Sequence, residues 1–197
     1  MPSPLGHVLG GIAAGWLIAG RPARRAADPQ AAPGAPGRPQ AGLRGRASRF
    51  LRQPSLVQSA AYFGALGMLA DIDFLVGRHS HHTHSLGAVA AVFLAVVALA
   101  GRHAWPAALA SAAAYASHLL FDWLGNDTSP PIGILALWPF SNGFFQSNLY
   151  LFEAICRRYW LPGFWAHNLR AVAWELLVLV PLVALVSRLR PTPHPPQ

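Results

Sequence analysis

Charged side chains are scarce in this chain of 197 residues, and two residue types are nearly or wholly missing. Charged residues make up 11% of the sequence, against about 25% in typical soluble proteins. Lysine is absent, so all 15 basic residues are arginines. Cys156 is the only cysteine, which excludes a disulfide within the chain and leaves the redox compartment open. Because hydrophobic residues reach 53%, the composition favours a membrane protein over a soluble one.

Five apolar stretches dominate the sequence, each close to the roughly 20 residues that a helix needs to cross a bilayer. Glycine and alanine at close spacing in several of them suit tight packing of helices in lipid. The sequence therefore predicts an all-α, polytopic membrane bundle of about five helices, with a very apolar soluble helical domain as the alternative. The stretches cover approximately residues 3–20, 54–76, 85–101, 104–122 and 171–187.

Two long connections separate these stretches. Residues 21–53 are rich in Pro, Gly, Ala and Arg and hold eight of the arginines, so we expect a disordered loop. Residues 123–170 are aromatic, and "FFQSNLYLFEAICRRYW" within them repeats apolar groups every three or four positions, which predicts an amphipathic interfacial helix. The expected organisation is a first membrane helix (1–20), the loop (21–53), a three-helix metal-binding core (54–122), an aromatic interfacial segment (123–170), and a last membrane helix with its tail (171–197).

The distribution of arginine predicts the orientation of the chain in a cell membrane. If residues 21–53 are cytoplasmic and five helices cross, eleven arginines fall inside and four outside, as the positive-inside rule requires. The C-terminal tail is then also cytoplasmic. The same threading puts all the candidate metal ligands described below at the outer ends of their helices. We therefore expect a multi-pass protein whose partner is the lipid bilayer and whose site faces the extracytoplasmic side.

The stretch "ASHLLFDWLG" carries His118 and Asp122, which are four residues apart and share one helix face. Imidazole and carboxylate at this spacing can hold one divalent ion. A simple His–Asp hydrogen bond is the alternative for an isolated pair. Within a membrane helix the balance moves towards function, because ionisable groups are costly there.

A second group of titratable residues lies in "DIDFLVGRHSHHTHSLG". Asp71 and Asp73 are two apart and cannot share a face of an α-helix, so we expect one to bind metal and the other to turn away or to start the loop. Within "HSHHTHS", His79 and His84 are the preferred ligands. The two histidines between them, His81 and His82, are expected to be dispensable.

A third candidate lies near the start of the chain. His7, in "GHVLGGIAAG", is as consistent with a packed polar residue as with a ligand. Thr83 and Ser85 are interpreted as hydrogen-bonding supports for the ligands, since no nucleophile motif surrounds them.

These motifs, taken in order, resemble the YdjM-like family of bacterial membrane-bound metal-dependent hydrolases. The resemblance rests on His7, then "ADID", then H-x4-H ending in "THS", then SH-L-x2-D, then G-x5-PF at residues 133–140. It covers residues 1–20 and 54–140, roughly half the chain. It implies an all-helical fold related to the zinc-dependent phospholipases C and single-strand nucleases, which carry a cluster of zinc ions.

Two departures accompany the resemblance. The family usually has arginine after the first of the paired histidines, whereas this chain has Ser80, so an arginine facing the anion is absent or is supplied by Arg78. The last pair of ligands in the related enzymes has no clear counterpart here. His167 and Glu175 are the candidates for it.

The resemblance implies hydrolysis of a phosphoester or a phospholipid-like substrate. Divalent ions held by His and Asp would activate a water molecule, and Asp71 or Asp73 could accept its proton. Zinc is expected first, with manganese or iron as alternatives, because no thiolate accompanies the ligands. A divalent-cation transporter and a metal-stabilised membrane scaffold remain alternatives; nucleic acid is not expected and no protein partner is indicated. The expected metal ligands are His7, Asp71, Asp73, His79, His84, His118 and Asp122.

Overall fold

The chain folds into helices, as the sequence predicts. The computed structural model describes residues 1–20, 54–76, 80–128 and 130–189, and within these ranges it contains no strand beyond isolated bridges. The predicted loop at 21–53 and the tail after residue 189 lie outside the described residues. The helices are α1 (Pro4–Ala19), α3 (Leu56–Met68), the 3₁₀ helix η1 (Leu69–Val76), α4 (Leu86–Ala100), the 3₁₀ helix η2 (Arg102–Ala104), α5 (Trp105–Leu124) and α6 (Phe164–Leu189).

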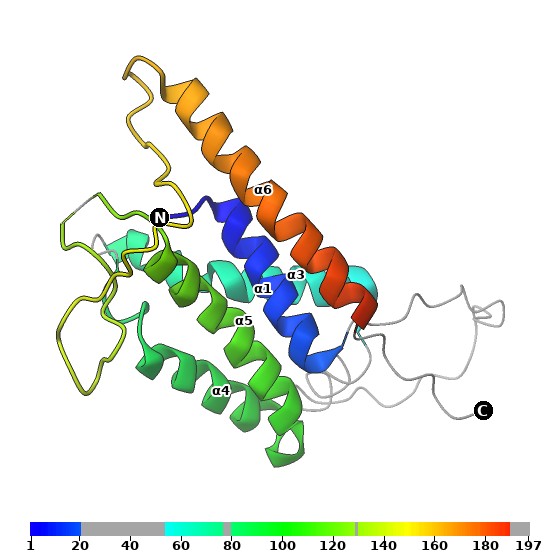
Figure 1. Cartoon of the computed structure of the whole chain (residues 1–197). Coiled ribbons are helices and arrows are strands. Elements are labelled where there is room, and N and C mark those ends of the chain that lie inside the picture. The colour runs from blue at the N-terminus through cyan, green and yellow to red at the C-terminus, as the bar shows by residue number, and fades with distance from the viewer. Residues whose placement is uncertain (21–53, 77–79, 129, 190–197) are drawn as a thin grey trace.

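Helix α1 is the centre of the bundle. It packs against α3, α5 and α6, while α4 packs against α5 (Figure 1). At its crossing with α3 the two backbones touch, because an added Cβ at Gly11 would lie 2.3 Å from the carbonyl oxygen of Phe63. A Cβ at Gly67 would lie 2.3 Å from the carbonyl oxygen of His7. Only glycine fits at both positions, as is common where helices pack tightly in membranes.

Serine residues are the N-caps of two helices beside the candidate site, α1 and α4. Ser3 caps α1 by accepting a hydrogen bond from the Gly6 amide, and Ser85 caps α4 by accepting one from Ala88. Ser3 is itself held by Glu175 of α6, which accepts hydrogen bonds from the Ser3 amide and the Ser3 hydroxyl. These contacts fix the first turn of α1, and with it His7, against the neighbouring helices.

Helix α6 is the one described helix that is both long enough and apolar enough to cross a membrane. Its 26 residues extend about 39 Å, more than the roughly 30 Å of a bilayer's hydrocarbon core. Only four of its residues are buried in the protein, and it exposes large apolar side chains such as Leu177 and Leu185. Helices α1 and α4 are apolar but have 16 and 15 residues. The multi-pass arrangement therefore stays a prediction for the other helices.

The second predicted span, residues 54–76, is not one continuous α-helix. Helix α3 ends at Met68 and the chain continues as η1, whose tighter winding carries Asp71 and Asp73. The residues around the junction, from Gly67 to Ala70, are all small or apolar, so the composition at the junction gave no sign of the change. The spans predicted at 85–101 and 104–122 match α4 and α5 within two residues at each end, whereas α6 begins at Phe164 instead of residue 171.

The amphipathic helix predicted within residues 144–160 is wrong. This segment is irregular and extended, and its backbone pairs with the end of α5. The Leu151 amide donates to the carbonyl of Leu124, and the Asn126 amide donates to the carbonyl of Phe152, both at 2.8 Å. Phe152 is 1% exposed between them. Burial of this aromatic side chain and pairing with the α5 terminus outweigh the helical spacing of the apolar residues.

Candidate metal centre

Five of the predicted ligands meet at one end of the bundle. They are His7 from α1, Asp71 from η1, His84 from the turn before α4, and His118 and Asp122 from α5. Figure 1 places the start of α1 beside the C-terminal end of α5, which brings these elements together. Four of the five side chains are at least nine-tenths buried, and Asp71 has 19% of its side chain exposed.

Three of these residues define the centre of the cluster. His84 Nε2 and His118 Nε2 are 3.1 Å apart, and Asp122 Oδ2 lies 3.3 Å from the first and 3.2 Å from the second. Ligand atoms about 2.0–2.1 Å from a tetrahedral zinc ion are about 3.3 Å from one another. The three atoms therefore stand at the mutual distances that one bound ion requires.

Asp71 and His7 extend the cluster on its two sides. Asp71 Oδ1 lies 3.6 Å from His118 Nε2 and 3.9 Å from His84 Nε2, in the position of a fourth ligand. His7 Nε2 faces the other carboxylate oxygen of Asp122 at 3.4 Å, and its ring stacks on that of His118 at 3.7 Å. The two oxygens of Asp122 thus face different imidazoles.

Buried polar atoms without hydrogen bonds support a bound cation. Both carboxylate oxygens of Asp122 and Nδ1 of His7 are buried and make no hydrogen bond to the described part of the chain. Such atoms are costly unless a partner satisfies them. A divalent ion among imidazole nitrogens and carboxylate oxygens would satisfy Asp122, so the residues present fit a metal.

Two of the imidazoles are held in the orientation that a ligand needs. His118 Nδ1 donates a hydrogen bond to the carbonyl oxygen of Gly67 at 2.7 Å, which leaves Nε2 to face the centre. His84 Nδ1 lies 3.0 Å from Asp73 Oδ2, and the Thr83 hydroxyl donates to the same oxygen at 2.9 Å. Carboxylate or carbonyl partners behind ligating histidines are typical of metal sites.

The protonation of His84 follows from these neighbours. Burial disfavours its charged form, but the carboxylates of Asp122 and Asp73 beside the ring outweigh that effect and raise the pKa of His84 to about 9. Without metal, the cluster therefore keeps a proton on His84 at neutral pH. A divalent cation has to displace that proton to bind.

A cavity of about 1400 Å³ opens above the cluster. His7, Asp71 and Asp122 lie at its floor, and the same cavity is lined by three arginines of a later segment. Those arginines are Arg157, Arg158 and Arg170. The cavity therefore gives a ligand access to part of the cluster, and its wall carries both carboxylates and arginines.

Comparison with known proteins decides the family. The sequence model of the YdjM inner membrane protein family matches residues 1–192, almost the whole chain. The chain belongs to the YdjM inner membrane protein family. No curated protein and no solved structure was found to match it. The description of the family is that of an inner membrane protein and names no reaction, so the chemistry has to be argued from the site.

The remaining predicted ligands of this YdjM-family chain are placed differently. His79 and Arg78 lie outside the described residues. Asp73 does not turn away from the cluster: its Oδ2 lies 3.0 Å from His84 Nδ1, and Asp71, Asp73 and His84 form a further group that could hold a metal ion. His81 lines the cavity, whereas His82 is exposed with its ring edge-on to Trp138.

The two candidates for a further ligand pair do not join the cluster. His167 donates from Nε2 to the carbonyl of Ala154 at 2.7 Å, and Glu175 is occupied by Ser3. Among the predicted supports, Thr83 contacts both Asp73 and His84, but Ser85 caps α4.

Sequence reasoning missed two features of the site. The carbonyl of Gly67 holds His118, and no side-chain pattern could indicate a backbone acceptor. The arginines of the cavity were counted only as charges for topology. The adjacent pair in "CRRYW" was the available signal, although its position above a site 35 residues away depends on the fold.

Proposed function

We propose that this YdjM-family protein is a membrane-bound, metal-dependent hydrolase of phosphoester bonds. One observation carries the proposal: buried His and Asp side chains converge at metal-ligand distances, and Asp122 and Asp71 of this cluster line a cavity that three arginines also line. Imidazole and carboxylate donors favour a divalent cation, and arginines favour a phosphate beside it.

The proposed core ligands are His84, His118 and Asp122, with Asp71 completing the set. Zinc suits imidazole and carboxylate donors in a compact site, and manganese or iron would also be accepted by them. When bound, the cation would supply Lewis acidity to the phosphoryl group and to an attacking water molecule.

Asp71 is the proposed proton acceptor. It is the cluster's one partly exposed carboxylate and it lines the cavity, so it can reach a water molecule there. The water oxygen bonds to phosphorus, its proton passes to the Asp71 carboxylate, and the ester P–O bond breaks. The departing alkoxide then takes the proton from Asp71, which restores the carboxylate. Asp73 serves instead to orient His84, since Asp73 lies behind that ring.

The proposed site faces the extracytoplasmic side, an inference that rests on the arginine asymmetry of the sequence. Single cysteines introduced into a Cys156→Ser background test it. Asn142→Cys, in the exposed segment between α5 and α6, should react with an impermeant maleimide in intact cells. Arg188→Cys, at the other end of α6, should react only after permeabilisation. The reverse pattern would place the site on the cytoplasmic side.

The hydrolase itself is tested with purified protein and a panel of phosphomonoesters and phosphodiesters, after metal analysis. Asp71→Asn should weaken metal binding, because one ligand is lost, and at saturating metal it should still lower kcat by about a hundredfold or more, because a general base is lost. His103→Ala, an exposed histidine on η2, is the matched control and should change neither quantity. A wild-type protein that holds metal and hydrolyses none of the panel would contradict the proposal.

A further inference from the structure

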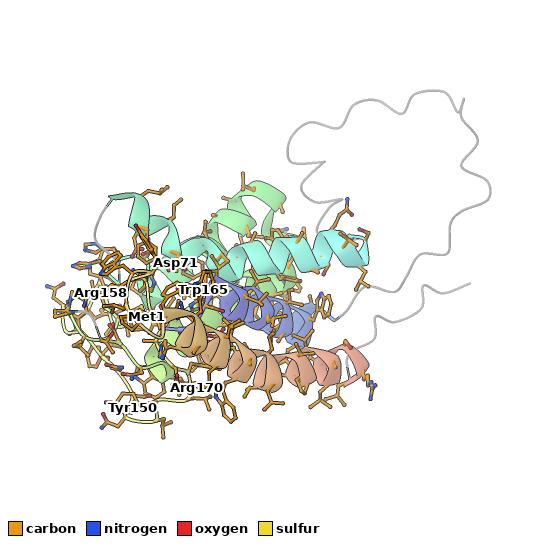
Figure 2. All side chains as sticks on the ribbon, turned by 90° about the horizontal axis from the view of Figure 1, so that it is seen from above. Met1, Asp71, Tyr150, Arg158, Trp165 and Arg170 are labelled. Carbon is orange, nitrogen blue, oxygen red and sulfur yellow. The ribbon has the colours of Figure 1, made fainter. Side chains whose placement is uncertain are left out.

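Part of the wall of the cavity is formed by residues 153–170, which we call the rim segment. It runs from the irregular chain after Phe152 into the first turns of α6. Its three arginines, Arg157, Arg158 and Arg170, all line the cavity. Figure 2 shows Arg158 and Arg170 at the same end of the bundle as Asp71.

The rim segment carries more positive than negative charge. Arg170 pairs with Glu153 at 3.0 Å, and Glu153 is the one acidic residue of the segment. The guanidinium of Arg157 lies over the ring of Phe74 from η1 at 4.4 Å, a contact that holds it beside the cavity. If a cation engages Asp71 and Asp122, the cavity lining keeps three arginines against the carboxylates of Glu153 and Asp127, a balance that favours an anion.

The outer surface of the same segment is aromatic. Tyr159, Trp160 and Trp165 are 74%, 66% and 74% exposed. They lie directly before and at the start of α6, the helix that has the length and composition of a membrane span. Tyrosine and tryptophan at the end of a membrane helix are typical of the headgroup region of the bilayer.

From these observations we propose that the rim segment is a headgroup subsite for an anionic phospholipid. In this subsite Arg158 and Arg170, with Arg157, bind the lipid phosphate inside the cavity. The acyl chains stay in the bilayer beside Trp160 and Trp165. This inference names the substrate class of the proposed hydrolase and rests on that proposed function.

Charge and position together favour a lipid over a soluble phosphate. Arginines in a water-exposed cavity would serve either ligand, because both present the same oxygens. The exposed aromatic side chains, however, gain nothing from a soluble ligand, and they are placed where a bilayer meets water. A lipid anion in that layer reaches the cavity without leaving the membrane surface.

The test measures binding in detergent-solubilised protein with three probes: dihexanoyl phosphatidic acid, dihexanoyl phosphatidylcholine and glycerol 3-phosphate. Phosphatidic acid should bind on the order of tenfold more tightly than either other probe, since it alone joins a net negative charge to acyl chains. The double variant Arg158→Gln/Arg170→Gln should weaken binding of phosphatidic acid by about tenfold. Metal content, measured on the same samples, should equal that of the wild type.

The double variant Arg102→Gln/Arg188→Gln is the matched control, because it removes the same charge from exposed positions outside the cavity. It should bind all three probes as the wild type does. The single variant Arg158→Glu gives a second reading if the double variant lacks metal, and it should also weaken binding of phosphatidic acid.

Three results would overturn the subsite. These are equal affinity for glycerol 3-phosphate and phosphatidic acid, equal losses in the control and rim variants, or unchanged binding in Arg158→Glu. Turnover of p-nitrophenyl phosphate and bis(p-nitrophenyl) phosphate by the wild-type preparation reports separately on the hydrolase. Binding that follows the arginines without any turnover would refute the proposed function, whereas turnover without arginine-dependent lipid binding would refute the subsite.

Discussion

The floor and the rim of the cavity are built in opposite ways. In the cluster at and beneath the floor, His84 and His118 are fully buried, and each is fixed by a partner behind its ring. Rim residues such as Arg158 and Arg170 are exposed. A metal ion requires ligands within a few tenths of an ångström of their places, so its site needs rigid packing. A ligand that arrives and leaves is better served by side chains that can move. Variants of the floor should therefore change metal binding and stability, whereas variants of the rim should change ligand binding.

The largest effect is expected from loss of a floor ligand. His118→Ala should abolish stoichiometric metal binding and lower the free energy of unfolding by about 3 kcal/mol or more, because buried Asp122 loses its neighbours. Metal analysis and thermal unfolding in detergent measure both quantities. His103→Ala should match the wild type in each. Full metal occupancy in His118→Ala would show that His118 is not a ligand.

Removal of the partner behind His84 should have a smaller effect on metal. Asp73→Asn is expected to weaken metal affinity by about 10- to 100-fold without abolishing it, since the ring loses its orienting carboxylate. Competition with a chelator of known affinity measures the change. Asp127→Asn is the control, because that carboxylate accepts a hydrogen bond from Gly133 on a neighbouring loop. An equal loss of metal affinity in both variants would show that the effect comes from removing a negative charge near the site and not from the orientation of His84.

The pH should also separate the metal-free floor from the metal-bound one. The pKa of His84 is raised from its ordinary value near 6.5 to about 9 in the metal-free fold. That proton stabilises the metal-free protein below about pH 6.5, and the stabilisation is lost as pH rises through about 9. Metal affinity moves in the opposite direction and should rise by up to about tenfold per pH unit over this window.

Thermal unfolding with and without added zinc, between about pH 6 and pH 8.5, gives the measurement. The rise in midpoint caused by zinc should grow with pH. A rise that is constant across the range would mean that no proton leaves the site on metal binding.

The smallest effect is expected from the two histidines beside the cluster. The double variant His81→Ala/His82→Ala should keep metal affinity within about twofold of the wild type, since neither ring belongs to the candidate ligand groups. His84→Ala, in the same stretch of sequence, should lose the metal. Loss of metal in the double variant would show that His81 or His82 is a ligand and that the ligands assigned in this stretch are wrong.

Much of the floor could be predicted from sequence because its determinants are local. The four-residue spacing of His118 and Asp122 put both on one face of α5, where they lie 3.2 Å apart. The alternating direction of successive helices then predicted that His7, Asp71 and His84 lie at the same end of the bundle. These inferences need only helix periodicity and the order of the helices along the chain.

The rim could not be predicted in the same way. Its apolar spacing indicated a helix between residues 144 and 160, but the backbone pairs with the end of α5 instead. That pairing joins residues distant in sequence and has no local signature. The same holds for the change from α3 to η1 at Met68, which brings both Asp71 and Asp73 beside His84.

Gly67 joins the architecture of the bundle to its chemistry. Because Gly67 has no side chain, α3 contacts the backbone of α1 at His7. The carbonyl of Gly67 also orients His118 from α5. Gly67 therefore helps to position three of the elements that meet at the candidate metal centre, namely α1, α3 and α5. An alanine there would push the helices apart and move the acceptor at the same time. Two rings would then lose alignment together, and the resulting failure would resemble the loss of a ligand, although Gly67 has no atom that touches the ion. The absence of a Cβ at position 67 is therefore as necessary to the geometry of this centre as its imidazole side chains.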